Sequence, residues 1–309
     1  ERYFALAVAQ ERVRVVERQL AAVTRSRTEA HDRYQLGASP VTDTHEADAA
    51  LAGVRAQQSA ARLELSVQRD RLAGSTGLAQ PTARLPAQPP APVDDLPAWL
   101  AAAEADHPRL RLLMQAVAVA EQKLRQHSVA GRATLELVAQ AGHDRIAGSG
   151  DFGSARNRSV NGMVGVQLNI PLYSGGMREA QEREAAERLN QARAELDLAR
   201  EEVAQQVRAT WQGLLTGAAR LAALQEGLTA SRARADATRL GREVGDRTLL
   251  DVLNAENAQA DAELALAQAR SDQVLTRLRL AALADRLDEA LLAQVNALLA
   301  SEAGPEAAR

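Results

Sequence analysis

The sequence predicts a mainly α-helical protein with one β-hairpin, built from long antiparallel coiled-coil helices. Three observations support this fold class. Apolar residues recur at spacings of three and four over most of the 309 residues, which is the period of a helix. Only 2% of the residues are aromatic although 46% are hydrophobic, which suits thin, alanine-rich helical layers better than a thick core. Two short segments near the middle alternate apolar and polar residues, as strands do.

Residues 1–73 are expected to form a first hairpin of two helices. Their apolar residues are spaced by three and four, as at Val16 and Leu20. Gly37 suits the left-handed conformation that ends many helices, and Pro40 suits the opening of the next one. The short connection between them makes the two helices antiparallel.

A proline-rich linker is expected to follow over residues 74–107. Six of the ten prolines lie between residues 81 and 97, so residues 81–97 are expected to form neither a helix nor a central strand. Residues 108–131 then read as one helix, with Pro108 in its first turn and Gly131 at its end.

Residues 132–173 contain the two predicted strands, Thr134–Ala141 and Val164–Ile170, with a polar, glycine-rich loop over 147–159 between them. Two strands do not hold together alone in water. They either lie against a helix in an ordinary α+β domain or form part of a transmembrane barrel, with one face in lipid and the other in water. A barrel has to close, so the second alternative needs further hairpins from elsewhere.

Residues 174–284 repeat the helical hairpin on a larger scale. Gly245 breaks the helical pattern, and residues 285–309 follow the second helix. At a fixed offset of 208 residues, Gly37 corresponds to Gly245 and Asp43 corresponds to Asp251. Further matches continue in the same ungapped register, so the two hairpins are copies of one structural unit.

Composition excludes several functional classes. The net charge of −3 gives no basic field for nucleic acid. Cysteine is absent, the five histidines are scattered, and no nucleophile–base pair, phosphate loop or metal-ligand spacing is present, so no catalytic site, metal or cofactor is expected. No stretch is long and apolar enough for a membrane-spanning helix. The chain begins at Glu1 without a signal peptide, which is expected of a trimmed or processed fragment.

Three segments resemble the TolC-like outer-membrane channel proteins of tripartite efflux and type I secretion systems. Tyr34–Asp43 and Val244–Ala255 are similar to the family's two periplasmic hairpin turns, and Val166–Gly176 is similar to the end of a barrel strand. The resemblance implies a homotrimer whose helices form an α-barrel continuous with a shared transmembrane β-barrel in outer-membrane lipid. Residues 74–107 and 285–309 would contribute an equatorial belt. The family's signal, first helix and first strand hairpin would precede Glu1.

The resemblance also implies a function and partners. The protein would be a passive exit duct in the outer membrane, with most of the chain in the periplasm and a gate at the periplasmic helical tips. Its partners would be a periplasmic adaptor protein and an inner-membrane ABC or RND transporter. Two alternatives remain at this stage. The chain could itself be a periplasmic adaptor, which would need a compact β-rich domain, or a coiled-coil scaffold, which would leave the alternating strand unexplained.

Motif positions imply three groups of site residues. The residues that match the network closing the family's entrance are Thr42, Asp43, Arg242, Arg247, Asp251 and Asn254. The residues that match the adaptor-docking tips are Leu36, Gly37, Val244 and Gly245. The residues expected on the membrane side of the strand are Val164, Val166, Leu168, Ile170 and Tyr173.

Two of the gate positions depart from the family pattern. Arg242 replaces the usual aromatic residue, and an Arg242–Asp43 ion pair can stand in for a tyrosine hydrogen bond. Asn254 replaces a residue that is often acidic, which weakens the acid-rich constriction. Helix capping is the alternative role for the short polar residues at the two tips, which are Thr42, Asp43, Thr248 and Asp251.

Overall fold

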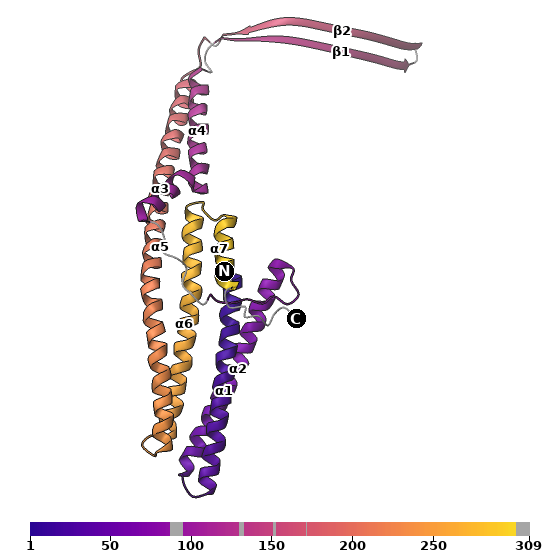
Figure 1. Cartoon of the computed structure of the whole chain (residues 1–309). Coiled ribbons are helices and arrows are strands. Elements are labelled where there is room, and N and C mark those ends of the chain that lie inside the picture. Colours follow the sequence, from indigo (N-terminus) through magenta and orange to yellow (C-terminus); the bar gives the residue numbers. More distant parts are fainter. Residues whose placement is uncertain (87–94, 130–132, 151–152, 171, 301–309) are drawn as a thin grey trace. The chain divides into compact units, whose positions relative to one another are not determined.

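The structure, a computed structural model, describes residues 1–86, 95–129, 133–150, 153–170 and 172–300. Its elements follow one another as α1 (Arg2–Gln35), α2 (Val41–Thr76), α3 (Leu96–Asp106), α4 (Pro108–Val129), β1 (Thr134–Gly150), β2 (Gly153–Asn169), α5 (Met177–Glu243), α6 (Leu249–Leu283) and α7 (Glu289–Ala300) (Figure 1). This is the mainly helical fold with one strand pair that the sequence predicts. Contacts divide the chain into two compact units, one of Glu1–His107 with Glu202–Arg309 and one of Pro108–Glu201.

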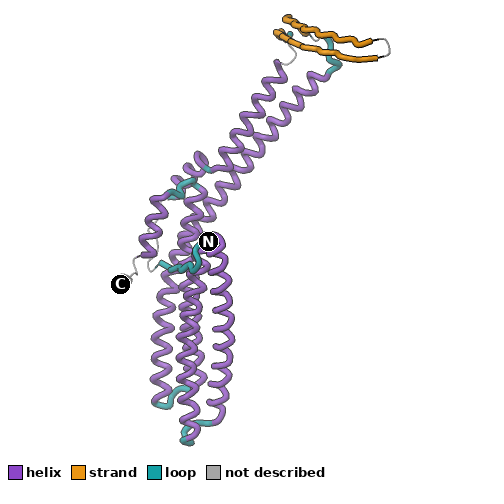
Figure 2. Tube along the Cα trace, turned by 90° about the vertical axis from the view of Figure 1, so that its right-hand side faces the viewer, coloured by secondary structure: helices purple, strands orange, loops and turns teal. Residues whose placement is uncertain are grey.

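Two antiparallel helical hairpins make up most of the first unit. One is α1 with α2, and the other is α6 with the last part of α5, and their turns lie at the same end of the unit (Figure 2). α2 ends at Gly77, which takes the left-handed conformation and donates its N–H to the carbonyl of Ala73 at 2.8 Å. The hairpin bounds agree with the helices expected from the apolar spacing.

A buried cluster near the turns joins the two hairpins. It contains α1, α2 and α6 residues together: Val16, Val23, Ala30, Ala47, Leu51, Val54, Leu249 and Leu253. A second cluster joins the start of α1 to α6 and α7 through Phe4, Val274 and Val295. Because most of these side chains are small, the helices can approach one another closely over a thin core.

One seam of α5 has a strict period of seven. Its buried members in the first unit are Val207, Leu214, Leu221, Leu228, Ala235 and Arg242. A seven-residue repeat keeps one stripe of a helix against its partner, as in a coiled coil. Arg242 therefore occupies a seam position, which explains why an arginine at the end of the helix is buried.

A buried hydrogen bond fixes the register between α5 and α6. The Gln273 side chain is 5% exposed and donates from Nε2 to the carbonyl oxygen of Leu214 at 3.1 Å. Its Oε1 lies against Gly217, so that a Cβ added there would overlap it. Glycine at this position is what leaves room for the amide.

The second unit contains α4, the strand pair and the first part of α5. Arg193 of α5 donates to Glu121 of α4 at 2.9 Å. β1 and β2 are antiparallel neighbours, and their register places Leu135 opposite Leu168 and Leu137 opposite Val166.

The strands are longer than the sequence predicts, and the expected loop over 147–159 is wrong. Residues 147–150 pair with residues 153–156, and only residues 151–152, which lie outside the described residues, separate the strands. Glycine and serine give this part no alternating pattern, yet the backbone ladder does not depend on side chains. The strand also ends earlier than expected, because Pro171 has no N–H to continue a ladder. Ile170 and Tyr173 therefore follow β2 instead of belonging to it.

No helix within the described residues is long and apolar enough to cross a membrane.

Candidate functional site

The two hairpin tips have the same backbone geometry. In the first, Gly37 has a φ of 69°, and the N–H of Ala38 donates to the carbonyl of Arg33 at 2.8 Å. In the second, Gly245 has a φ of 83°, and the N–H of Asp246 donates to the carbonyl of Gly241 at 2.8 Å. Each pair is related by the 208-residue offset, and the pattern is a Schellman cap. The repeat predicted from the sequence is therefore present in the tip turns.

The two copies differ at the start of the helix that follows the turn. Thr248 caps α6, and its hydroxyl accepts the N–H of Asp251 at 3.1 Å while the Asp251 carboxylate accepts the N–H of Thr248 at 3.0 Å. This reciprocal arrangement is a capping box. Pro40 holds the equivalent place before α2 and provides no side-chain cap. Asp43 therefore lacks the local partner that Asp251 has.

The capping box also sets the charge of Asp251. Hydrogen bonds from the Thr248 backbone and hydroxyl, together with the nearby Arg247 guanidinium, hold the pKa of Asp251 below its usual value. The carboxylate thus stays ionised at neutral pH at the N-terminus of α6, where negative charge is stabilised. Helix capping, one of the two roles considered for Asp251, is a role that this residue has.

Arg242 faces two carboxylates from the other hairpin. Its Nη2 lies 3.9 Å from Oδ2 of Asp43 on α2, and its Nε lies 3.7 Å from Oε1 of Glu29 on α1. The guanidinium is 8% exposed, and its Nε and Nη1 make no hydrogen bond to any described residue. The structure therefore brings together the predicted pair, Arg242 and Asp43, at ion-pair distances that exceed those of hydrogen bonds.

Glu29 is a residue beside the predicted gate positions that the sequence reasoning missed. Its carboxylate lies 3.3 Å from Nε of Arg33 as well as beside Arg242, so it links the two arginines. In the sequence, Glu29 belongs to an ordinary charged helix face, and no feature of the sequence distinguishes it from the other charged residues there. The buried seam position of Arg242, which a strict count of seven along α5 reveals, is the signal that could have directed attention to this partner.

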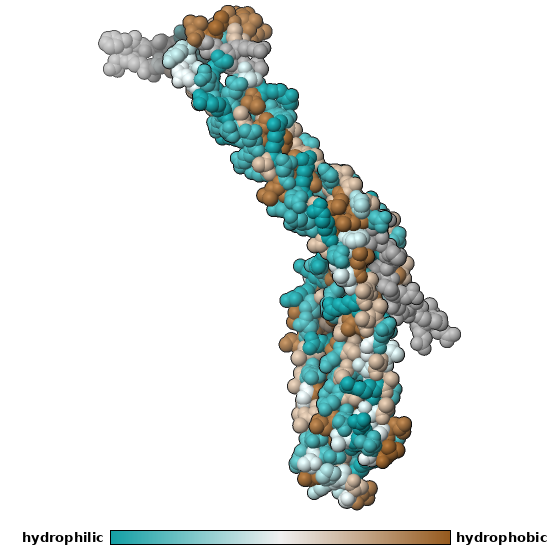
Figure 3. Space-filling model, turned by 90° about the vertical axis from the view of Figure 1, so that its left-hand side faces the viewer, coloured by the Kyte–Doolittle hydropathy of each residue, from teal (hydrophilic) through white to brown (hydrophobic). Residues whose placement is uncertain are grey.

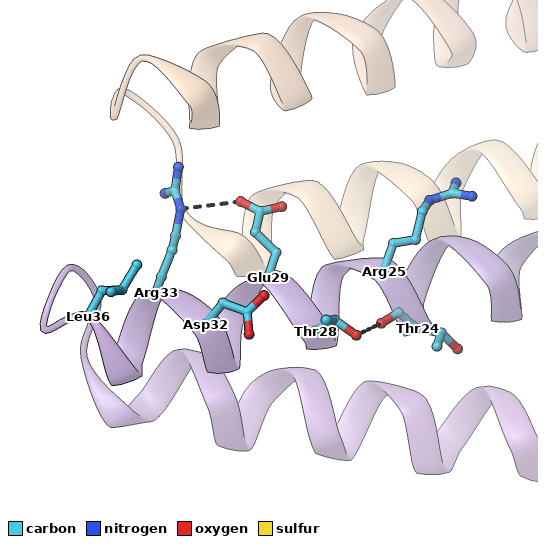
Figure 4. Close-up of a pocket in the computed structure, with 7 residues that line it drawn as sticks. All are labelled: Thr24, Arg25, Thr28, Glu29, Asp32, Arg33 and Leu36. Carbon is cyan, nitrogen blue, oxygen red and sulfur yellow. Dashed lines mark hydrogen bonds and ion pairs between the residues drawn. The ribbon is translucent and has the colours of Figure 1, made fainter.

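A shallow groove of about 440 Å³ runs along this part of α1 (Figure 4). It is lined by Thr24, Arg25, Thr28, Glu29, Asp32, Arg33 and Leu36. Figure 4 shows Arg25, Glu29 and Arg33 extending on the side of α1 where the second hairpin is drawn. The groove thus connects the charged network to the first tip, where Leu36 stands.

The remaining predicted gate positions lie at the surface near the two tips. Arg247 is exposed, but its side chain crosses Gly241 so closely that a Cβ there would lie 2.7 Å from its Cγ. Thr42 and Asn254 are exposed, and the structure brings neither to a side-chain partner within the described residues. The site therefore divides into a buried pair, a capping box and an exposed rim.

Hydrophobic side chains are exposed at both tips. Leu36 is 83% exposed and Val244 is 74% exposed, each next to its left-handed glycine. In the space-filling view, brown hydrophobic residues are visible among the hydrophilic ones at the lower end of the molecule (Figure 3). Single exposed apolar residues are common. Leu36 and Val244, however, occupy equivalent positions in the two copies of the repeat, and both hairpin tips lie at the same end of the unit.

Where Thr134–Ala141 pairs with Gly162–Asn169, the strand pair has one apolar and one mainly polar face. Directly paired residues share a face, so Val164, Val166 and Leu168 join Leu135 and Leu137 on one side, and all five are exposed. On the other side, Glu136 pairs with Gln167, and Thr134 pairs with Asn169. Neither face is covered by other described residues. Among those residues, no cluster of His, Cys, Asp and Glu side chains could hold a metal ion.

Comparison with known proteins decides between the alternatives for this fold. Residues 99–285 match the family described as "Outer membrane efflux protein". The chain belongs to this family. The family's description as an efflux protein of the outer membrane agrees with the predicted duct and not with the periplasmic adaptor. The predicted location in the outer membrane, with a helical part in the periplasm, agrees as well.

Three relatives illustrate the match. The chain is 33% identical to the outer membrane efflux protein BepC of Brucella suis, covering 84% of this chain and 56% of BepC. It is 30% identical to the alkaline protease secretion protein AprF of Pseudomonas aeruginosa, covering 99% of this chain and 64% of AprF. It is 27% identical to the outer membrane protein TolC of Escherichia coli, covering 96% and 62%. The chain thus spans less than two thirds of each relative.

Solved structures share the fold at lower identity. VceC from Vibrio cholerae matches with a TM-score of 0.76 and 17% identity over 93% of this chain and 69% of VceC. The CmeC channel of Campylobacter jejuni matches with a TM-score of 0.75 and 12% identity over 96% of this chain and 64% of CmeC. At these identities the agreement concerns the fold, and it confirms the predicted fold class.

Proposed function

We propose that the chain is part of an outer-membrane exit duct of a tripartite efflux or type I secretion system. The duct is passive, has no catalytic chemistry and is gated where the two helical tips meet. It forms from three copies of the chain, and its partners are a periplasmic adaptor, an inner-membrane ABC or RND transporter and outer-membrane lipid.

The strand pair carries this proposal. The strands are 17 residues long, and where Thr134–Ala141 pairs with Gly162–Asn169 one exposed face is apolar and the other mainly polar. A transmembrane β-strand needs about 9–11 residues and alternates in this way between lipid and lumen. Because open strand edges are not tolerated in lipid, the pair has to join further hairpins, and other copies of the chain contribute them in the proposed trimer.

The division of the chain follows from the same proposal. Residues 132–173 form the barrel hairpin, and residues 1–73 and 174–284 form the periplasmic hairpins. Residues 108–131 lead to the barrel, and the segments 74–107 and 285–309 form the equatorial belt. Membership of the family supports this assignment, since its members combine a helical and a β-barrel part.

The gate is proposed at the network around Arg242. Asp43, Arg242 and Glu29 connect three helices, so that separating the two hairpins would break their ion pairs. Arg247 and Asp251 line the rim, with Thr42 and Asn254 beside them. The exposed pair Leu36 and Val244, each next to its glycine, is the proposed docking point for the helical hairpin of the adaptor.

Fractionation and detergent behaviour of the full-length protein test the proposal. We expect the protein in the outer-membrane fraction, extractable with detergent as a trimer that forms conducting pores in planar lipid bilayers. A protein that is released without detergent, or that stays monomeric in micelles and does not conduct, would refute the duct. The names of the relatives cover both efflux and protease secretion, so the cargo depends on the inner-membrane partner.

A further inference from the structure

Two glutamates of α6 are buried in the seam between the hairpins, away from the tips. Glu256 and Glu263 are 8% and 9% exposed and lie seven residues apart. A buried carboxylate is costly unless a positive charge pairs with it. Arg239 of α5 lies 3.1 Å from Oε1 of Glu256, and Arg232, seven residues earlier, lies 3.1 Å from Oε1 of Glu263. The antiparallel helices thus form two equivalent rungs.

The rung at Glu263 extends to the first hairpin. Its second oxygen, Oε2, lies 2.6 Å from Nη2 of Arg18 on α1, while Gln259 donates to Oε1 at 3.3 Å. Both carboxylate oxygens are therefore occupied, one by an arginine of each hairpin. This rung ties α1 directly to α5 and α6.

The rung at Glu256 is incomplete. Its Oε2 is buried and accepts no hydrogen bond from any described residue. Arg25 lies seven residues after Arg18 on α1, and Glu256 lies seven residues before Glu263 on the antiparallel α6, so the two pairs are in the same register. The α1 arginine that would match Arg18 at this rung is therefore Arg25.

A cavity of about 300 Å³ spans both rungs, since Arg18 and Glu263 of the complete rung line it as well. Arg25, Arg239 and Glu256 line it together with Ala22 and Ala260. Arg25 is exposed and makes no ion pair within the described part of the chain, and Figure 4 shows its guanidinium extending on the side of the second hairpin. Among the described residues, the unpaired Arg25 guanidinium and the unsatisfied buried Oε2 of Glu256 thus line one space, together with the paired residues of the complete rung.

We propose that Arg25 closes onto Oε2 of Glu256 and completes a two-rung arginine–glutamate–arginine clamp between the hairpins. The clamp holds α1 against α6 at a distance from the hairpin tips, and its ion pairs have to break before the two hairpins separate. A role of the clamp in regulating the entrance depends on the proposed duct function, whereas the contact between Arg25 and Glu256 does not. It differs from the tip network, because α6 residues supply the carboxylates and α1 and α5 supply the arginines.

A thiol probe tests the clamp in the full-length protein. The chain contains no cysteine, so Ala260→Cys introduces a single reporter at a position that is 9% exposed and lines the cavity. In this background we expect Arg25→Gln and Glu256→Gln each to raise the rate of maleimide labelling by roughly tenfold, within the coupling range of contacting charged residues. The double variant should show no further increase. Arg12→Gln, on the exposed face of α1, is the matched control and should leave the rate unchanged.

The outcomes separate the clamp from the duct. If Arg25→Gln labels like the Arg12→Gln control while Glu256→Gln labels faster, Arg25 is not the partner and the clamp is overturned. Equal rates in all variants overturn it as well. Conductance of the same proteins reports on the duct independently. Faster labelling in variants of a protein that never conducts supports the clamp and refutes the duct. Conduction together with unchanged labelling rates supports the duct and refutes the clamp.

Discussion

Replacing Gly217 with alanine gives a sharp test of the packing between α5 and α6. Alanine is favoured over glycine in a helix by about 1 kcal/mol, so propensity alone predicts a more stable protein. The new Cβ, however, would overlap Oε1 of Gln273. The Gln273 amide would have to leave and would lose its 3.1 Å hydrogen bond to the carbonyl of Leu214.

The magnitude follows from these two terms. A buried amide without its hydrogen bond costs about 1–3 kcal/mol, and the helix propensity of alanine offsets about 1 kcal/mol of this. We therefore expect Gly217→Ala to lower the free energy of unfolding by up to about 2 kcal/mol. Gly227→Ala in the same helix is the matched control, because no atom lies within 4 Å of an added Cβ there, and it should raise stability by about 1 kcal/mol.

The assay is unfolding of the full-length protein in detergent, followed by circular dichroism for both variants under one condition. Adding Gln273→Ala to Gly217→Ala should recover much of the lost stability, since no polar group then remains unsatisfied. If Gly217→Ala proves as stabilising as Gly227→Ala, Gln273 does not occupy the space above Gly217 and the reasoning is wrong.

Three further predictions concern the tips and the strands. Asp43→Ala or Arg247→Ala should raise single-channel conductance in planar bilayers, and unchanged conductance would count against their gate role. Because the pKa of Asp251 is lowered in the folded protein, its contribution to stability is complete above the ordinary aspartate pKa and is lost as the pH falls through the lower native value. The free energy of unfolding, measured against pH, should therefore show an acid-side decrease that is absent in Asp251→Asn. Val166→Arg should reduce recovery from the outer membrane, at a cost of about 2–4 kcal/mol at mid-bilayer, whereas Gln167→Arg on the opposite face should not.

Local sequence signals predicted the helices and turns well. Gly37 and Gly245 mark the tips because only a residue that tolerates a positive φ ends a helix in this way. The bounds of α1, α2 and α5 follow from apolar spacing and from the positions of Pro40 and Gly245. These signals are local, so a single sequence contains them.

Contacts between distant segments were harder to predict. The pairing of Arg242 with Asp43 was predicted from a motif position, but Glu29 was not, because its role depends on how α1 lies beside α5. The strands extend beyond the predicted residues because backbone pairing continues through a stretch without alternation. The Glu256 and Glu263 rungs resemble ordinary surface charges until the packing of the helices shows them to be buried.

The proline before α2 makes the two copies of the repeat mechanically unequal. In the second copy the acidic residue after the turn is held by its own helix end through Thr248. In the first copy Pro40 has no hydroxyl to hold the equivalent Asp43, whose carboxylate is left to face Arg242 of the other copy. An opening motion therefore has to disturb the first tip, while the second tip can stay intact as a rigid end.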